Sequence, residues 1–476
     1  MSINLMDTCS PTVQKTKYDN ASCDVGVIHL GYGAFHRAHQ SVYFDDYMET
    51  TGDMRWGVAA VNLRESESGS FKEISDTAGY MLKTIAPNGT ESFRLVRSHC
   101  RFVDWSSAAD EAENLASLPS VHIISITVTE SGYYLNDDMT LNLNDALISS
   151  EIAGGKSCSI YAYLLRALKG RANTIDQPIN ILCCDNIRAN GKMLSRNFKA
   201  YLKACGETDL LAWVDENVSF PCSMVDKITP RATDELKAEI KSLFPGQSLN
   251  PIHAEEFSQW VLEDKFTAPM PALNKVGVEI VEDVDPFEET KIRILNGGHT
   301  ALCYLGALAG LNTFDEIMDR ADLLQFYYDF EIREVLPGLD LEVPFDKNVY
   351  VETVAKRFSN AALADQLERI CMDGFSKMTI YVRPTIDSCL KQGITPHKSF
   401  ASIASWYVYA KRFSSGKVHI IYHEPLWGQL KPLLEVGAEE EFATTKQLWG
   451  DIPDRYDEFV PGVLSAIKQM EQSWPA

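Results

Sequence analysis

In the first half of the chain, short apolar runs alternate with segments of helical periodicity. The clearest runs are residues 25–30, 56–62, 122–129 and 179–184. Alternation of this kind is typical of βαβ units, in which helices connect neighbouring parallel strands. We therefore predict an α/β fold with a mostly parallel sheet for this half.

The pattern changes near residue 286. Long amphipathic segments such as 288–308 dominate from there on, and strand-like runs become scarce. A chain of 476 residues is also longer than one hydrophobic core usually covers. We predict an α/β domain over residues 1–285 and a mostly α-helical domain over residues 286–476.

Composition narrows the class of protein. The formal charge of −22 disfavours nucleic acid or an anionic membrane surface as partner, because both require a basic patch. We find neither a long uncharged apolar stretch nor a basic, then apolar, leader at the N-terminus. Eleven cysteines without a CxxC pair predict reduced thiols. A globular cytoplasmic protein without nucleic-acid or membrane partners is expected.

A glycine-containing turn follows the first apolar run. Gly31 and Gly33 lie between the predicted strand 25–30 and the helix-like segment 37–47. In a dinucleotide fold, the first glycine permits a tight turn and the second lets a pyrophosphate approach a helix N-terminus. His36 occupies the place of the usual third glycine, so this motif alone fits an ordinary strand-to-helix turn equally well.

The next predicted strand, 56–62, bears on cofactor choice. It ends at Asn62 without the carboxylate that commonly holds a ribose hydroxyl, and Arg64 follows two residues later. NAD and NADP therefore both stay open at this point. His36 and His39 lack a third ligand at suitable spacing, and we predict that no metal binds them.

The segment after Pro286 carries the strongest chemical signal. On an α-helix, Glu288, Lys291, Asn296 and His299 fall within an arc of about 140°. Among apolar neighbours, each of these polar groups needs a hydrogen-bond partner. A functional site therefore explains them better than a solvated face does. The glycines at 297–298 are unfavourable inside a helix and predict close approach of another backbone or a ligand.

Polar residues also follow several predicted strands. Asn186 and Asn190 follow the run 179–184, Glu130 follows the run 122–129, and Asp226 ends another β-like segment. Doubly wound sheets place their ligands at the carboxyl ends of strands. For either of the first two strand ends alone, turn formation is an equally good explanation.

Taken in order, six motifs resemble the long-chain polyol dehydrogenase family, which includes mannitol 2-dehydrogenase, D-arabinitol 4-dehydrogenase and fructuronate reductase. The motifs are GYGAFHRAHQ, VTESGYYLN, CDNIRANG, FPCSMVDKITP, KIRILNGGH and DGFSK, and they span nearly the whole chain. The spacing Lys-x4-Asn-x2-His is the most specific of them. Lys227 departs from the family, which usually has arginine there, and this puts its local contacts in doubt.

The resemblance implies a Rossmann-type N-terminal domain, a helical C-terminal domain and an active site between them that works without metal. It implies that Lys291 is the general base and that His299 orients the substrate. Asn186 and Asn296 would hold the reacting oxygen of the substrate, with Asn190 as the alternative to Asn186. The remaining roles implied are substrate binding by Asp226 and Arg369, together with Lys291 and His299; proton passage by Glu130 and Glu288; and cofactor binding by Gly31, Gly33, Ala34, Phe35, Arg37, Asn62 and Glu130.

The prediction from sequence is an NAD(P)-dependent oxidoreductase that interconverts a sugar alcohol and its ketose. D-arabinitol is preferred as substrate to mannitol, and a fructuronate reductase is the alternative. A protein that senses NAD(P) without turnover is a more remote alternative. The resemblance favours NAD, while Arg64 keeps NADP open. A monomer or a small homo-oligomer is expected.

Overall fold

The computed structural model describes residues 12–75, 79–136, 138–245, 249–339 and 342–474. The chain forms two compact units. Unit 1 comprises residues 1–86 and 90–285, and unit 2 comprises residues 87–89 and 286–476.

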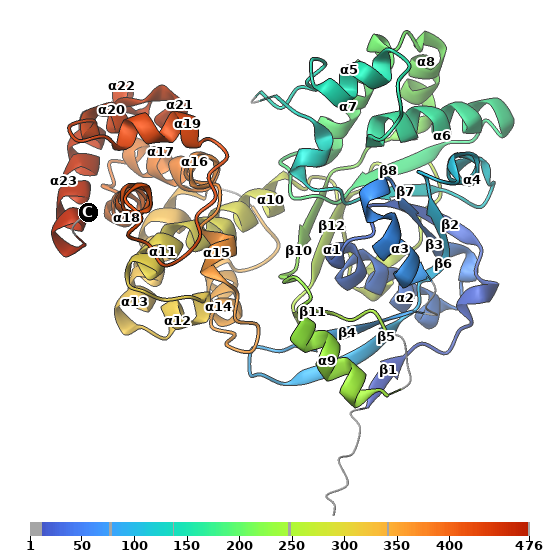
Figure 1. Cartoon of the computed structure of the whole chain (residues 1–476), viewed down its shortest axis with the longest axis horizontal. Helices are drawn as coiled ribbons and strands as arrows, with labels where there is room; N and C mark the ends of the chain where they lie inside the picture. Colours follow the sequence, from blue (N-terminus) through green and yellow to red (C-terminus); the bar gives the residue numbers. More distant parts are fainter. Residues whose placement is uncertain (1–11, 76–78, 137, 246–248, 340–341, 475–476) are drawn as a thin grey trace, which may run out of the picture. The chain divides into compact units, whose positions relative to one another are not determined.

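A six-stranded parallel sheet forms the centre of unit 1 (Figure 1). Its spatial order is β6-β3-β2-β7-β8-β9. Numbered along the chain within this sheet, the order is 3-2-1-4-5-6, which is the order of dinucleotide-binding Rossmann folds. The predicted parallel sheet is therefore confirmed. The strands are β2 Val25–Leu30, β3 Gly57–Asn62, β6 His99–Asp104, β7 Ile123–Ile126, β8 Ile179–Cys183 and β9 Val218–Ser219.

Helices cover both faces of this sheet, because alternate strand residues point to opposite sides. Val27 packs with Phe44 of helix α2 (Gln40–Thr51) on one face. Ile28 packs on the other face, in a cluster that includes residues of α6 and α7. The further helices of unit 1 are α1 Ala34–Ala38, α3 Ser68–Ser75, α4 Ala109–Asn114, α5 Ala146–Ile152, α6 Ile160–Thr174, α7 Asn190–Ala204, α8 Thr208–Asn217 and α9 Asp234–Leu243.

Two smaller sheets complete unit 1. One has the order β1-β5-β4-β11 and the other the order β10-β12-β13. The strands are β1 Val13–Lys15, β4 Tyr80–Ile85, β5 Glu91–Val96, β10 Ser223–Asp226, β11 Ile252–Glu255, β12 Gln259–Glu263 and β13 Glu279–Val281. Neither small sheet was predicted from the sequence, apart from the segment that ends at Asp226.

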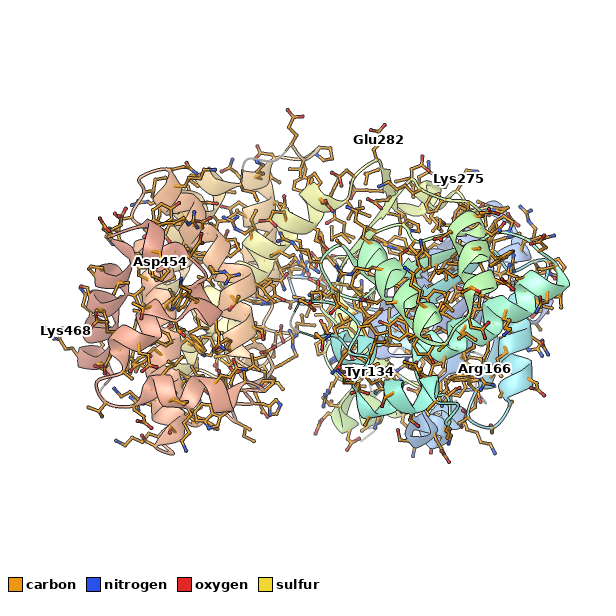
Figure 2. All side chains as sticks on the ribbon, turned by 90° about the horizontal axis from the view of Figure 1, so that it is seen from above. Tyr134, Arg166, Lys275, Glu282, Asp454 and Lys468 are labelled. Atoms are coloured by element: carbon orange, nitrogen blue, oxygen red, sulfur yellow. The ribbon has the colours of Figure 1, made fainter. Side chains whose placement is uncertain are left out.

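In its described part, unit 2 consists of helices and connecting segments around one apolar core. Buried Trp406, Tyr407 and Trp449 belong to that core, and Lys468 points outward from α23 (Figure 2). The helices begin with α10 Asp285–Lys291 and continue with α11 Gly297–Leu308, α12 Phe314–Met318, α13 Ala321–Phe330, α14 Lys347–Phe358, α15 Leu367–Ile370, α16 Gly374–Lys377, α17 Arg383–Lys391, α18 His397–Ser414, α19 Trp427–Leu430, α20 Glu439–Thr444, α21 Lys446–Trp449, α22 Ile452–Arg455 and α23 Phe459–Ser473. This confirms the predicted helical C-terminal part.

In the described residues of unit 2, three π-helical turns interrupt the helices, at Ile292–Asn296, Glu331–Val335 and Met378–Val382. The first of them contacts both of the others. Turns of this type are rare and recur at functional sites. Within the described parts of the chain, we find no helix with the length and apolar character needed to cross a membrane.

Candidate active site

The turn after β2 has the geometry of a phosphate-binding loop. Gly31 adopts a φ of +93°, and a Cβ atom there would lie 1.9 Å from the carbonyl oxygen of Thr127. Only glycine therefore fits this position. Gly33 precedes α1, and its own Cβ position meets no atom closer than 3.9 Å. The space beside Gly33 leaves the start of the helix accessible to a ligand.

A cavity of about 180 Å³ opens at this turn. It lies where β2 and β7, neighbours in the sheet, end, and where the strand order reverses. Open α/β sheets bind their ligands at such a switch point. Tyr134, labelled in Figure 2, lies at its wall. The lining residues are Gly31, Tyr32, Gly33, Asn62, Leu63, Arg64, Glu67, Thr127, Val128, Thr129, Gly132, Tyr134, Cys158, Ser159 and Ile160.

The cavity brings together three of the residues predicted to bind the cofactor: Gly31, Gly33 and Asn62. Ala34, Phe35, Arg37 and Glu130 do not line it. Ala34 and Phe35 pack against apolar clusters of unit 1. Glu130 is exposed in the turn that follows β7.

Arg37 makes its contacts inside unit 1, and one of its partners, Tyr32, lines the cavity. Its Nη1 atom donates to the side chain of Asn250 at 3.2 Å. Its guanidinium lies 5.4 Å from the ring centres of both Tyr32 and Tyr80. These contacts give Arg37 a structural role, and burial lowers its pKa.

His36 replaces the third glycine by stacking rather than by absence of a side chain. Its ring lies 3.2 Å from that of His29 on β2, with an interplanar angle of 9°. Its Nε2 atom lies 3.0 Å from Nε2 of His99. Burial lowers the pKa of all three histidines, that of His29 to about 3. The three rings are therefore neutral at physiological pH and join the helix to the sheet.

Charges of both signs lie beyond the end of β3. The Asn62 amide donates to the backbone oxygen of Arg64 at 2.9 Å and to Asp104 at 3.3 Å. Arg64 and Glu67 both line the cavity and form an exposed ion pair of 3.5 Å. A 2′-phosphate at this end would meet the Glu67 carboxylate as well as Arg64. Sequence reasoning missed Glu67, since its position depends on the turn between β3 and α3.

The two asparagines after β8 differ in their surroundings. Asn190 is buried; its amide donates to the backbone oxygens of Asp185 and Ser223, and its side-chain oxygen accepts from the N–H of Ser223. Asn186 lies exposed in the turn itself. Asn190 thus uses its hydrogen-bonding groups within the protein, which disfavours it as the residue that holds a reacting oxygen.

Asp226 is the last residue of β10 and is 3% exposed. The adjacent Lys227, where the family usually has arginine, donates from Nζ to the backbone oxygen of Phe257 at 3.1 Å. Lys227 therefore has a hydrogen-bond partner in the protein backbone.

The segment with Lys291 is not the continuous α-helix that was predicted. Helix α10 ends at Lys291, a π turn occupies Ile292–Asn296, and α11 begins at Gly297. The N–H of Gly297 donates to the carbonyl oxygen of Ile292, five residues earlier. In a π turn, residues five apart lie on about the same side, whereas an α-helix separates them by about 140°. The π turn therefore brings Lys291 and Asn296 closer to the same side than a continuous α-helix would.

The paired glycines have a different reason from the one predicted. A Cβ atom on Gly298 would lie 2.8 Å from Oε1 of Glu331 and 3.1 Å from the ring of Tyr327. A Cβ atom on Gly297 would lie 3.4 Å from the carbonyl oxygen of Tyr381, which is an ordinary van der Waals distance. The close approach at Gly298 comes from side chains of unit 2.

His299 lies between aromatic rings. It stacks on Phe358 at 4.0 Å and meets Phe314 edge-on at 4.6 Å. Burial lowers its pKa well below the usual value, and the cations Arg369, Lys377 and Arg357 add to this effect. Within the described parts of the chain, its buried Nε2 has no hydrogen-bond partner. A neutral imidazole with an unused ring nitrogen is suited to a substrate hydroxyl.

Two of these three cations, Arg369 and Lys377, have defined partners in unit 2. Arg369 in α15 forms a two-point ion pair with Asp365, which precedes that helix. Lys377 donates from Nζ to the carbonyl oxygen of Ile370 at 2.7 Å, and burial lowers its pKa. The sequence motif DGFSK contains Lys377, yet no role was assigned to it there.

Glu288 and Lys291 are both buried, at 9% and 7% exposure.

Among the residues that the structure describes, no group of three histidine, cysteine or acidic side chains is arranged to hold a metal ion.

Comparisons with known proteins agree along the whole chain. Residues 25–275 match the mannitol dehydrogenase Rossmann domain, and residues 283–471 match the mannitol dehydrogenase C-terminal domain. D-arabinitol 4-dehydrogenase of Ralstonia nicotianae is 33% identical over 94% of this chain and 97% of its own length. D-mannonate oxidoreductase of Escherichia coli is 31% identical over 96% of both chains.

A solved structure gives the same result. The ternary complex of Pseudomonas fluorescens mannitol 2-dehydrogenase with NAD and D-mannitol has a TM-score of 0.86 and 28% sequence identity. The match covers 97% of this chain and 95% of the other. Both domain matches and the full-length relatives therefore place the chain in the mannitol dehydrogenase family.

Proposed function

We propose that this protein is an NAD-dependent polyol dehydrogenase, which interconverts a secondary alcohol of an open-chain sugar alcohol with the matching ketose. The observation that carries the proposal is the π turn at Ile292–Asn296, because residues five apart in such a turn, here Lys291 and Asn296, lie on about the same side. We assign cofactor binding to residues 1–285 and most substrate contacts to residues 286–476. A cytoplasmic location and a monomer or small homo-oligomer stay predictions.

The cavity beside Gly31 fits part of a dinucleotide. At about 180 Å³ it is smaller than the roughly 300–1,000 Å³ of complete ligand pockets. Gly31 and Gly33 would hold the pyrophosphate, and Asn62 lies where a ribose would be held. When bound, NAD supplies the acceptor for the hydride. The relative crystallised with NAD and D-mannitol supports this choice.

The protein's own groups then handle the proton and the oxygen. Lys291 takes the hydroxyl proton during oxidation and returns it during reduction. A lysine does this only when its pKa is lowered towards neutrality, which burial favours. The amides of Asn186 and Asn296 donate to the oxygen as negative charge develops on it. His299 orients a neighbouring hydroxyl, and Glu130 and Glu288 pass the proton to solvent.

Asp226, Arg369 and Lys377 are proposed to bind the other hydroxyl groups. The guanidinium of Arg369 already uses Nε and Nη2 to bind Asp365. That edge is therefore occupied, while the edge formed by Nη1 and Nη2 can still clamp two hydroxyl groups or a carboxylate. We propose a polyol as substrate, with D-arabinitol ahead of mannitol and both ahead of fructuronate, and the relative named D-arabinitol 4-dehydrogenase supports this order. A relative named for D-mannonate, a sugar acid, keeps the uronate alternative as a specific rival.

Steady-state assay of the purified protein against pentitols, hexitols, ketoses and fructuronate, with NAD(H) and NADP(H), tests the proposal. We expect the highest kcat/KM for a polyol with NAD. Faster reduction of fructuronate than oxidation of every polyol, each near its own pH optimum, would establish the uronate alternative. Binding of NADH without turnover of any of these compounds would favour a sensor.

A further inference from the structure

Two turns leave the sheet side by side at the carboxyl ends of β7 and β8. Ile126 and Cys183 are paired in register at these ends. The first turn contains Thr127, Val128 and Thr129, which line the dinucleotide cavity, and Glu130 follows them. The second turn contains Asp185 and Asn186.

A single carboxylate joins the two turns. Oδ2 of Asp185 accepts hydrogen bonds from the N–H of Val128 at 2.8 Å and the hydroxyl of Tyr133 at 2.6 Å. Oδ1 accepts from the N–H of Thr129 at 3.0 Å. Both oxygens are thus occupied, and all three donors belong to the turn after β7.

That turn has a backbone geometry that needs support. Thr129 adopts a φ of +68° with a ψ of 162°, and Tyr134 adopts a φ of +49°. Residues other than glycine rarely adopt such conformations, and they persist where the surroundings hold them in place. The bonds to Asp185 fall directly on the strained residue and its neighbour. Burial of the Asp185 carboxyl raises its pKa to about 6, which makes such a group an unusual choice for an ordinary loop contact.

We infer that Asp185 is a positioning residue that couples the cofactor site to the group holding the reacting oxygen. On one side its carboxylate fixes the Val128–Thr129 backbone at the cavity wall. On the other side it fixes its own turn, whose next residue, Asn186, is proposed to donate to the substrate oxygen. This inference rests on the proposed function.

An amide cannot replace this carboxylate. Asparagine offers one acceptor oxygen, so its NH2 group would face either the N–H of Thr129 or the two donors on Oδ2. A hydrogen bond to a charged group contributes enough to change an equilibrium by about tenfold to a hundredfold. We therefore expect Asp185→Asn to raise the Kd for NADH at least about tenfold and to lower kcat for polyol oxidation by a further factor of about ten.

The experiment compares wild type, Asp185→Asn, Tyr133→Phe and the control Asp145→Asn as full-length proteins. Asp145 also accepts from two backbone N–H groups, those of Leu147 and Ile148, but neither donor lines the cavity, as Val128 and Thr129 do. Fluorescence titration gives the Kd for NADH, and steady-state assay at saturating NAD gives kcat. We expect the control to leave both values within about twofold, and Tyr133→Phe to raise the Kd by a smaller factor than Asp185→Asn.

A role confined to stability would lower the melting temperature of both aspartate variants and leave Kd and kcat unchanged. That result would overturn the inference. If Asp185→Asn did not fold, an unchanged Kd and kcat in Tyr133→Phe would overturn it equally. Wild-type protein that bound no NADH would instead refute the proposed function, and this role with it.

Discussion

Replacing Gly31 with alanine tests whether the cavity depends on the turn after β2. Gly31 has a φ of +93°, and an added Cβ atom would lie 1.9 Å from the backbone oxygen of Thr127. The left-handed conformation costs about 1–2 kcal/mol for an L-residue. The overlap with fixed backbone adds about 1–3 kcal/mol, because β2 and β7 must separate.

The expected loss of unfolding free energy is thus about 2–5 kcal/mol, out of a typical total of about 5–15 kcal/mol. Gly52→Ala is the matched control, because Gly52 has a φ of +71° and nothing within 4 Å of its Cβ position. It should lose only the conformational cost of about 1–2 kcal/mol.

Urea unfolding of the three proteins gives the two differences, and titration with NADH gives the Kd. We expect Gly31→Ala to be less stable than Gly52→Ala and to bind NADH more weakly, because Thr127 and Gly31 both line the cavity. Equal stability of the two variants, together with an unchanged Kd, would refute the close approach and the assignment of the turn to the cofactor.

Two further predictions concern protonation and cofactor choice. Because burial lowers the pKa of His29 to about 3, the unfolded chain gains a proton below pH 6.5 that the folded protein does not. The free energy of unfolding should therefore fall by about 1.4 kcal/mol per pH unit from His29 alone as the pH drops. In urea unfolding between pH 6 and 5, His29→Gln should remove that part of the dependence on pH. The same dependence in wild type and variant would show that His29 is not held neutral. Glu67→Gln should raise kcat/KM with NADP about two- to fivefold and leave the NAD value unchanged, because it removes an exposed negative charge beside Arg64. If NADP exceeded NAD tenfold in the wild type, the assignment of NAD would be wrong.

The sequence allowed the parallel sheet and the residues at its strand ends to be predicted, since these depend on local patterns. Gly31 directly follows β2, and Asn62 is the last residue of β3. Such positions follow from the apolar run before them and from the rule that ligands bind at carboxyl ends.

Long-range contacts account for what could not be predicted. Arg37 donates to Asn250, 213 residues away in the chain, and no local pattern predicts that contact. His36 departs from the glycine motif, and the sequence does not show that its ring stacks on that of His29. The π turn at Ile292–Asn296 contacts two other π turns far along the chain, and periodicity over one helix does not contain that information.

The central claim is that Lys291 transfers the substrate proton. It is tested most directly by kcat of Lys291→Ala for oxidation of the preferred polyol from pH 7 to 10, together with the Kd for NADH. We predict a loss of at least about a hundredfold in kcat at every pH with a nearly unchanged Kd, because the residue is assigned to the substrate and not to the Gly31 turn. A kcat close to that of wild type in this range would contradict the account.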